Sequence, residues 1–406
     1  MDTLRLRRYA ELIVRKGVNL QAGQRLVITA DIEAAAFARL AAEAAYDAGA
    51  AHVYVNWSDE AVSKMTYTLA DHETFKRVDP WRVEFYRYYD EINACYIFIR
   101  SDDPDLLADV EPERIKDSSK STGTAFYDHD KALSANHIRW TYVNVPSKAW
   151  AKKLFPDIPE EEALLALWDK VLEASRVDDN PLAAWEAHDK MFKEKLKFLN
   201  NTGFRALRFT NSLGTDIRLE LPEGHYWEGG SNRAKDRLAF FPNIPTEEVY
   251  TLPDCRSVNG RVVASMPLTY NGVTIENFEL TFAEGKVVSY KAEKNEATLA
   301  GILELDDGAR MLGEVALVPH NSPISRMKML FYSSLFDENA SCHFALGDAY
   351  PMIKDFVKLS KEEAAGLGVN NSITHVDFMF GTADLQITGT TGDGKEVPVF
   401  VNGNWA

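Results

Sequence analysis

RLVITADIEAAAFARLAAEAAYDAGAAHVYVNW, residues 25–57, carries the pattern of a β-α-β unit. It begins with the β-rich segment RLVIT (25–29) and ends with another, HVYVNW (52–57). The Ala-rich residues 33–47 between them favour a helix, which Gly49 stops. A strand, a helix and a strand in this order predict part of a parallel sheet with a crossover helix.

The turn after RLVIT argues against one common use of such a unit. It contains Ala30, Asp31, Ile32 and Glu33, and no glycine. A dinucleotide-binding turn needs glycines so that its backbone can approach the pyrophosphate closely. The sequence therefore does not predict a Rossmann-type cofactor.

The pattern of elements changes near residue 200. Before it, the sequence predicts further strands at residues 91–100 and 140–145, and helices at residues 4–16, 160–175 and 181–199. After it, strands and hairpins dominate, with a strong hairpin signal at Asn271-Gly272 and one helix at residues 296–305. We predict an α/β domain over residues 1–200, with a parallel-type sheet and crossover helices. We predict an α+β domain over residues 201–406, with a mostly antiparallel sheet.

Composition narrows the possible partners. The chain has 406 residues and a formal net charge of −16, which argues against nucleic acid and anionic membrane surfaces and suits divalent metals. Its three cysteines, Cys95, Cys255 and Cys342, are far apart and form no CxxC pair, so a reducing cytoplasm is expected. We find no apolar run long enough to span a membrane.

One acidic residue stands inside an apolar strand pattern in the second half of the chain. The segment GEVALV, residues 313–318, contains Glu314 and is closed by Pro319. A carboxylate there is costly to desolvate unless a cation or several donors meet it. Taken alone, Glu314 is also explained by a strand end that reaches solvent, or by pairing with Arg310.

Three other segments add ligands of the same kind. They supply Glu247 and Glu248 (TEEVYT), Asp337, Glu338 and His343 (DENASCH), and His375 and Asp377 (THVDFMFG). On a strand, neighbours point to opposite faces, so only one of the TEEVYT glutamates can serve a given site, whereas His375 and Asp377 share a face. Carboxylates and imidazoles together suit zinc, cobalt or manganese. Five or six such ligands are more than one tetrahedral ion needs, and they suit two ions that share a bridging carboxylate.

Simpler explanations exist for each residue alone. A histidine is more often a core or surface residue than a ligand, and DEN also suits a helix cap. Other chemistries are less well supported, because GxSxG and P-loop motifs are absent and Cys342 next to His343 is not the geometry of a Cys-His pair. A glycosidase carboxylate pair would leave the two histidines unexplained.

These segments resemble those of the thermophilic-type metallo-aminopeptidases, the family typified by aminopeptidase T, aminopeptidase S and PepS. The similarity rests on FPNIPTEEVYT, GARMLGEVALVPHNSPIS, LFDENASCHFALGDAY and THVDFMFG, in the family's order, and runs from residue 241 to the closing NGNWA. The resemblance implies a metal-dependent aminopeptidase that hydrolyses the N-terminal residue from short peptides with a free N-terminus.

The resemblance also implies roles for individual residues. Its implied metal ligands are Glu248, Glu314, Glu338, His343, His375 and Asp377. Glu314 would bridge two divalent ions (zinc, cobalt, manganese or magnesium), and Glu314 or Glu338 would act as general base. Tyr350 of GDAY would stand over the substrate carbonyl. A cytoplasmic homodimer is implied as well.

Two alternatives remain open at this stage. One is a metal-dependent hydrolase of another amide or ester. The other is a metal-stabilised peptide-binding protein, in which a closed four-ligand shell would replace the open, water-bearing position of a catalytic ion.

Overall fold

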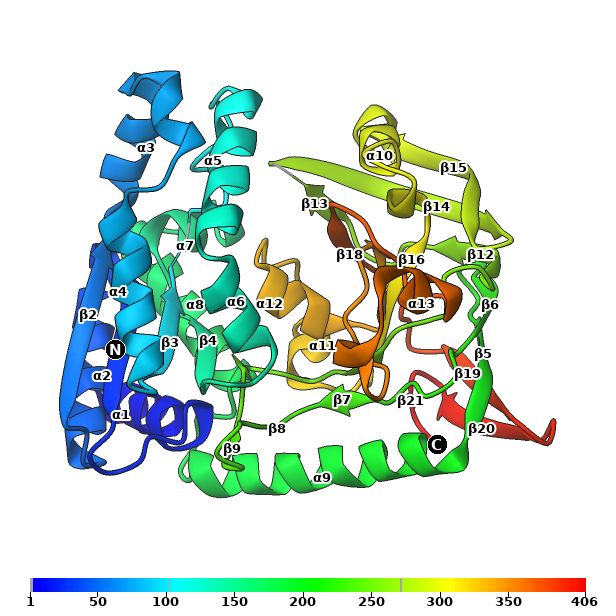
Figure 1. Cartoon of the computed structure of the whole chain (residues 1–406), viewed down its shortest axis with the longest axis horizontal. Coiled ribbons are helices and arrows are strands. Elements are labelled where there is room, and N and C mark those ends of the chain that lie inside the picture. The colour runs from blue at the N-terminus through cyan, green and yellow to red at the C-terminus, as the bar shows by residue number, and fades with distance from the viewer. Residues whose placement is uncertain (1–2, 102, 271) are drawn as a thin grey trace. The chain divides into compact units, whose positions relative to one another are not determined.

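The computed structural model describes residues 3–101, 103–270 and 272–406. They form two compact units (Figure 1), the first comprising residues up to Asp189 with Ser231–Pro245, the second Lys190–Gly230 with Thr246–Ala406. The sequence predicts one boundary, near residue 200. In the structure the chain leaves the first unit between residues 189 and 190, inside helix α9 (Pro181–Thr202). It returns to the first unit once, for residues 231–245, where residues 243–244 pair with the first sheet. The division into an α/β domain of residues 1–200 and a catalytic metal-binding domain of residues 201–406 stays a prediction.

The first unit is built on a parallel five-stranded sheet, in the order β10-β4-β3-β1-β2. Its strands are β1 (Arg25–Asp31), β2 (His52–Ser58), β3 (Cys95–Arg100), β4 (Trp140–Asn144) and β10 (Asn243–Ile244). A short hairpin, β8 (Asn232–Arg233) with β9 (Ala239–Phe240), belongs to the same unit. Strand β1, which pairs with both β2 and β3, is buried along most of its length, as expected for a parallel sheet covered on both faces.

Helices connect these strands (Figure 1). They are α1 (Thr3–Leu12), α2 (Ala35–Asp47), α3 (Glu60–Leu69), α4 (Pro80–Glu91), α5 (Pro112–Ala125), α6 (Tyr127–Ser134), α7 (Lys148–Leu154), α8 (Glu160–Ala174) and α9 (Pro181–Thr202). The chain moves from β1 to β2 through α2, then crosses back to β3 through α3 and α4. The connection from β1 to β2 and the connection from β2 to β3 run in opposite directions across the sheet. Because both crossovers are expected to be right-handed, α2 and α4 cover opposite faces of the sheet.

The second unit contains a large antiparallel sheet and a smaller one. The large sheet consists of β5 (Phe204–Thr210), β6 (Asp216–Glu220), β12 (Asn259–Val263), β13 (Leu268–Tyr270), β14 (Val273–Ala283), β15 (Lys286–Lys294), β19 (Gln386–Thr391), β20 (Glu396–Val401) and β21 (Asn404–Trp405). The smaller sheet has the order β18-β17-β16-β11-β7. Its strands are β7 (Glu228–Gly229), β11 (Val249–Thr251), β16 (Leu312–Leu317), β17 (His343–Gly347) and β18 (His375–Met379).

This unit also contains four short helices and a 3-10 turn that carries Glu338. They are α10 (Glu296–Leu303), α11 (Pro323–Met327), α12 (Ser334–Asp337), α13 (Lys361–Gly366) and the turn η5 (Glu338–Ala340). One face of the smaller sheet is apolar, because Val315, Phe344 and Phe378 occupy successive strands there and join the core of the unit. The opposite face is therefore available for polar chemistry.

The predicted fold class is confirmed, with local differences. The strand predicted at residues 91–100 begins only at Cys95, because Glu91 still belongs to α4. Helices α3 to α6 were not among the predicted elements. The pairing of β13 with β14 fits the predicted hairpin, although Asn271 itself lies outside the described residues. Within the described part of the chain, no helix has the length and apolar character needed to cross a membrane.

Candidate metal centre

The polar face of the smaller sheet gathers the predicted ligands through strand register. Glu314 on β16 and Asp377 on β18 both pair with Ala345 of the strand between them. Residues paired in one row point to the same side of a sheet, so these two carboxylates share a face. His343 lies two residues before Ala345, and His375 two residues before Asp377, which places both imidazoles on that face.

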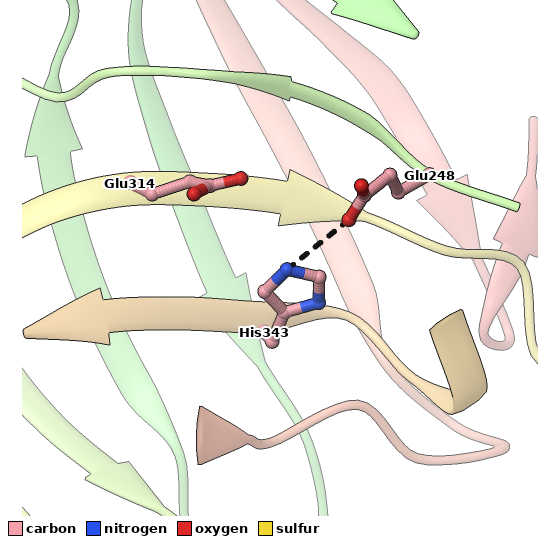
Figure 2. Close-up of side chains that lie close together, drawn as sticks. All are labelled: Glu248, Glu314 and His343. Atoms are coloured by element: carbon pink, nitrogen blue, oxygen red, sulfur yellow. Dashed lines mark ion pairs between the residues drawn. The ribbon is translucent and has the colours of Figure 1, made fainter. Parts of the chain in front are cut away.

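Among the described residues, two close groups of ligand atoms form. In each group one ligand atom per residue lies within 4.8 Å of the others: Glu248, Glu314 and His343 make the first, and Glu314, His375 and Asp377 the second. Figure 2 shows the first group, with Glu248 arriving from the segment before β11 and facing His343. Glu314 belongs to both groups, which is the position that a bridging carboxylate would occupy.

Both histidines are oriented by backbone carbonyls. His343 Nδ1 lies 3.1 Å from the carbonyl oxygen of Ser341, and His375 Nδ1 lies 2.7 Å from that of Asp348. A carbonyl can only accept, so each Nδ1 carries a proton and each Nε2 faces the carboxylates. His375 Nε2 lies 3.2 Å from Glu314 and 3.3 Å from Asp377. This backbone anchoring of Nδ1 is the arrangement by which proteins orient metal-binding imidazoles.

Two buried oxygens show that the residues fit a cation. Glu248 Oε2 and Asp377 Oδ1 have no hydrogen-bond partner among the described residues. Each lies 3.3 Å from an imidazole nitrogen without a well-aligned hydrogen bond to it. Buried carboxylate oxygens are costly to leave unsatisfied. A cation between these oxygens and the imidazoles would satisfy them.

The electrostatics of the centre indicate excess negative charge. Burial raises the pKa of Glu314, and burial together with the charges of Glu248 and Asp377 raises that of Glu338 well above its ordinary value. Burial disfavours the imidazolium of His343, but contact with Glu248 outweighs it and raises the pKa to about 10. Contacts with Asp377 and Glu314 likewise raise the pKa of His375 to about 11, against burial. In the absence of a metal, protons partly neutralise the carboxylates.

The other predicted residues lie near these groups but outside them. Glu338, on η5, is half-buried and accepts a hydrogen bond from Asn339 Nδ2 at 3.3 Å. The ring of Tyr350 lies 5.0 Å from that of His375, and its side chain is 47% exposed. Asp337, which the sequence offered as a ligand, accepts backbone hydrogen bonds from Phe331 and Ser333 and is absent from both close groups.

Some positioning groups were not identified from the sequence. Asn370 is buried in the segment before β18, and its Nδ2 donates to the carbonyls of Gly308 and Met311 before β16 and of Gly347 at the end of β17. Ala345, which pairs with both Glu314 and Asp377, places only a methyl group between the two carboxylates. An isolated asparagine or alanine gives no sequence signal, since these roles depend on register.

Comparison with known proteins identifies the family of the chain. The family model described as thermophilic metalloprotease (M29) matches residues 2–405. The chain belongs to this family. It is 45% identical to aminopeptidase 2 of Geobacillus stearothermophilus, over 99% of this chain and 97% of that protein. It is 43% identical to aminopeptidase AmpS of Bacillus subtilis, over 99% of this chain and 98% of that protein.

A solved structure is similar over the whole length. Wild-type AmpT from Thermus thermophilus covers 100% of both chains, with a TM-score of 0.94 and 37% sequence identity. The protein is a metallo-aminopeptidase of the M29 family, with a divalent metal cofactor and peptide substrates. The family assignment thus decides between the alternatives that the sequence left open.

Proposed function

We propose that this metallo-aminopeptidase uses two divalent ions that share Glu314. The observation that carries the proposal is the membership of Glu314 in both close groups of ligand atoms. One ion would be held by Glu248, Glu314 and His343, the other by Glu314, His375 and Asp377. Glu338 is a further candidate ligand.

Charge balance supports two ions. The centre contains the carboxylates of Glu248, Glu314, Glu338 and Asp377, and its two imidazoles are neutral when they bind metal. Two divalent cations neutralise four carboxylates, whereas one leaves a buried surplus of negative charge that is costly to keep. The mixture of oxygen and nitrogen ligands suits zinc, cobalt or manganese, and magnesium remains a candidate.

The residues around the ions would divide the chemistry. When bound, the two ions would supply Lewis acidity to the scissile carbonyl and lower the pKa of a shared water. Glu338 lies outside both close groups, so we assign it as the general base that accepts the proton of the attacking water, with Glu314 as the alternative. The same carboxyl would then return a proton to the leaving amine.

Tyr350 would stabilise the developing charge on the carbonyl oxygen. Its ring lies beside His375, and its exposure allows the hydroxyl to meet a substrate. A hydroxyl donor aimed at the oxyanion strengthens as charge builds up in the transition state. Substrate binding through the free N-terminal amine, at an ion or a carboxylate, would restrict cleavage to the first peptide bond.

The test is metal-dependent release of the N-terminal residue. Protein treated with a chelator is assayed on aminoacyl anilides and dipeptides, then again after addition of zinc, cobalt, manganese or magnesium. We expect metal to restore cleavage, and N-acetylated substrates to resist it. Metal binding without cleavage under any condition would overturn the proposal.

We also propose a cytoplasmic homodimer that acts on short peptides, as the family resemblance implies. Sedimentation equilibrium of the metal-loaded protein checks the oligomeric state. A mass of one chain at micromolar concentration would contradict it.

A further inference from the structure

A cavity of about 340 Å³ in the second unit has no role in the chemistry described above. Its polar lining comes from Ser265, His320, Ser325, Lys328 and Ser341, and Gly381 forms part of its wall. Methionine, isoleucine and leucine side chains complete it. A cavity with apolar walls and a few convergent polar groups is typical of small-ligand sites.

The cavity adjoins the polar face of the smaller sheet. Ser341 lies two residues before His343, and Gly381 two residues after Met379, which pairs with His343. Ser341 is buried, its carbonyl accepts the bond from His343 Nδ1, and its hydroxyl donates to the carbonyl of Gly381. The cavity wall therefore includes a residue that contacts His343 directly, with 3.1 Å between the Ser341 carbonyl oxygen and His343 Nδ1.

The charge of the cavity is opposite to that of the chain. The chain has 61 acidic and 45 basic residues, yet the described residues that line the cavity include Lys328 and His320 and no carboxylate. His320 Nδ1 lies 3.4 Å from Ser325 Oγ. A lysine, a histidine and hydroxyl groups favour an anionic group as the ligand.

The loop that carries Lys328 is held in an unusual conformation. Lys328 ends helix α11 with a φ of 52°, in the left-handed region that non-glycine residues seldom adopt. Asp337 fixes the following residues by accepting hydrogen bonds from the backbone nitrogens of Phe331 and Ser333, at 2.7 and 3.0 Å. These contacts fix the backbone from which the exposed Lys328 side chain extends at the cavity.

We propose that this cavity binds the C-terminal carboxylate of short peptide substrates, with Lys328 as its charged partner and His320 beside it. The inference rests on the proposed function, because it places the scissile bond at the metal centre. The cavity shares Ser341 with the anchor of His343, so a peptide cleaved at the centre can extend its C-terminal end toward Lys328. Peptides with a free C-terminal carboxylate that reaches this cavity are therefore the favoured substrates.

The experiment compares three substrates that share an N-terminal leucine: Leu-Gly-Gly, its C-terminal amide and leucine p-nitroanilide. The metal-loaded enzyme should prefer the free acid to the amide. In Lys328→Met, KM for Leu-Gly-Gly should rise about tenfold or more with little change in kcat, because an interaction common to ground and transition states is lost. The amide and the anilide should be cleaved as before.

Lys395→Met is the matched control, since Lys395 is an exposed lysine of the turn between β19 and β20 and does not line the cavity. His320→Gln should raise KM for the acid by a smaller factor. Equal effects of Lys328→Met on the acid and the amide, or none on either, would overturn the inference.

A failure of the proposed function gives a different result. If the wild-type enzyme cleaves no substrate with any metal, calorimetric titration with Leu-Gly-Gly and its amide still tests the cavity. Tighter binding of the acid, lost in Lys328→Met, would uphold the carboxylate site, and equal binding of acid and amide would overturn it.

Discussion

Histidines meet carboxylates in both units, but the surroundings of the pairs differ. In the first unit, His129 Nδ1 lies 2.9 Å from Asp90, and His72 Nε2 lies 2.9 Å from Asp117. Asp90 also accepts a hydrogen bond from Tyr96 at 2.6 Å. In the second unit, His375 Nε2 meets both Glu314 and Asp377, while its Nδ1 is held by a backbone carbonyl.

The difference shows what separates a structural ion pair from a metal centre. In the first unit each of these imidazoles meets one carboxylate, and the hydrogen bond with His72 lowers the pKa of Asp117. Several carboxylates around two backbone-anchored imidazoles leave a surplus of negative charge and unsatisfied buried oxygens. A histidine close to a carboxylate occurs in both cases. The orientation of the imidazole and the balance of charge therefore distinguish a metal centre from a structural ion pair.

Loss of the shared carboxylate should have the largest effect. Glu314→Gln keeps the shape of the side chain but removes the charge that both ions require. We expect kcat to fall by about three powers of ten or more, since a metal contributes several kcal/mol to the transition state. Anilide hydrolysis measures the loss, and circular dichroism checks that the fold is retained. Near-normal turnover would exclude a bridging role.

Removal of the Tyr350 hydroxyl should have an intermediate effect. Tyr350→Phe is expected to lower kcat by roughly one to three powers of ten, because one donor to the oxyanion is lost. KM should change little if the hydroxyl acts mainly in the transition state. Steady-state kinetics on a dipeptide series provide the measurement, and an unchanged kcat removes Tyr350 from the mechanism.

Metal binding should displace protons from the centre. With pKa values of about 10 and about 11, His343 and His375 are protonated at pH 7 in the metal-free protein. A bound ion needs the neutral imidazole, so each ion releases a proton and its apparent affinity should rise about tenfold per pH unit between pH 7 and 9. Calorimetry in buffers of different ionisation enthalpy counts these protons. A binding enthalpy independent of the buffer would contradict the prediction.

The histidine pairs of the first unit should affect activity least. His129→Gln removes one of the two partners described for Asp90 and should lower the free energy of unfolding by about 1 to 3 kcal/mol, as expected for a buried polar contact. Urea unfolding measures that loss, and kcat at a temperature where the variant is folded should equal that of the wild type. A tenfold fall in kcat would show that the first unit also serves the chemistry.

Much of the fold, and the residues that form the two close groups, could be predicted from the sequence for specific reasons. The alternating and apolar patterns at RLVIT, HVYVNW and GEVALV identify strands, and an acidic residue inside GEVALV is conspicuous. The spacing of His375 and Asp377 fixes their common face once β18 is recognised.

The remaining features depend on contacts between distant segments. No local pattern pairs Glu314 and Asp377 through Ala345, or returns residues 243–244 to the first sheet. The anchors of the two histidines are backbone carbonyls, which every residue possesses. The cavity at Lys328 likewise combines segments from residue 265 to residue 381, so it emerges only from the folded chain.

The central claim is that two ions share Glu314, and anomalous diffraction from zinc-loaded crystals tests it most directly. We predict two peaks about 3.5 to 4 Å apart. One should lie beside Glu248 and His343, the other beside His375 and Asp377, with Glu314 between them. A single peak at full zinc loading, or two peaks of which only one contacts Glu314, would contradict the account.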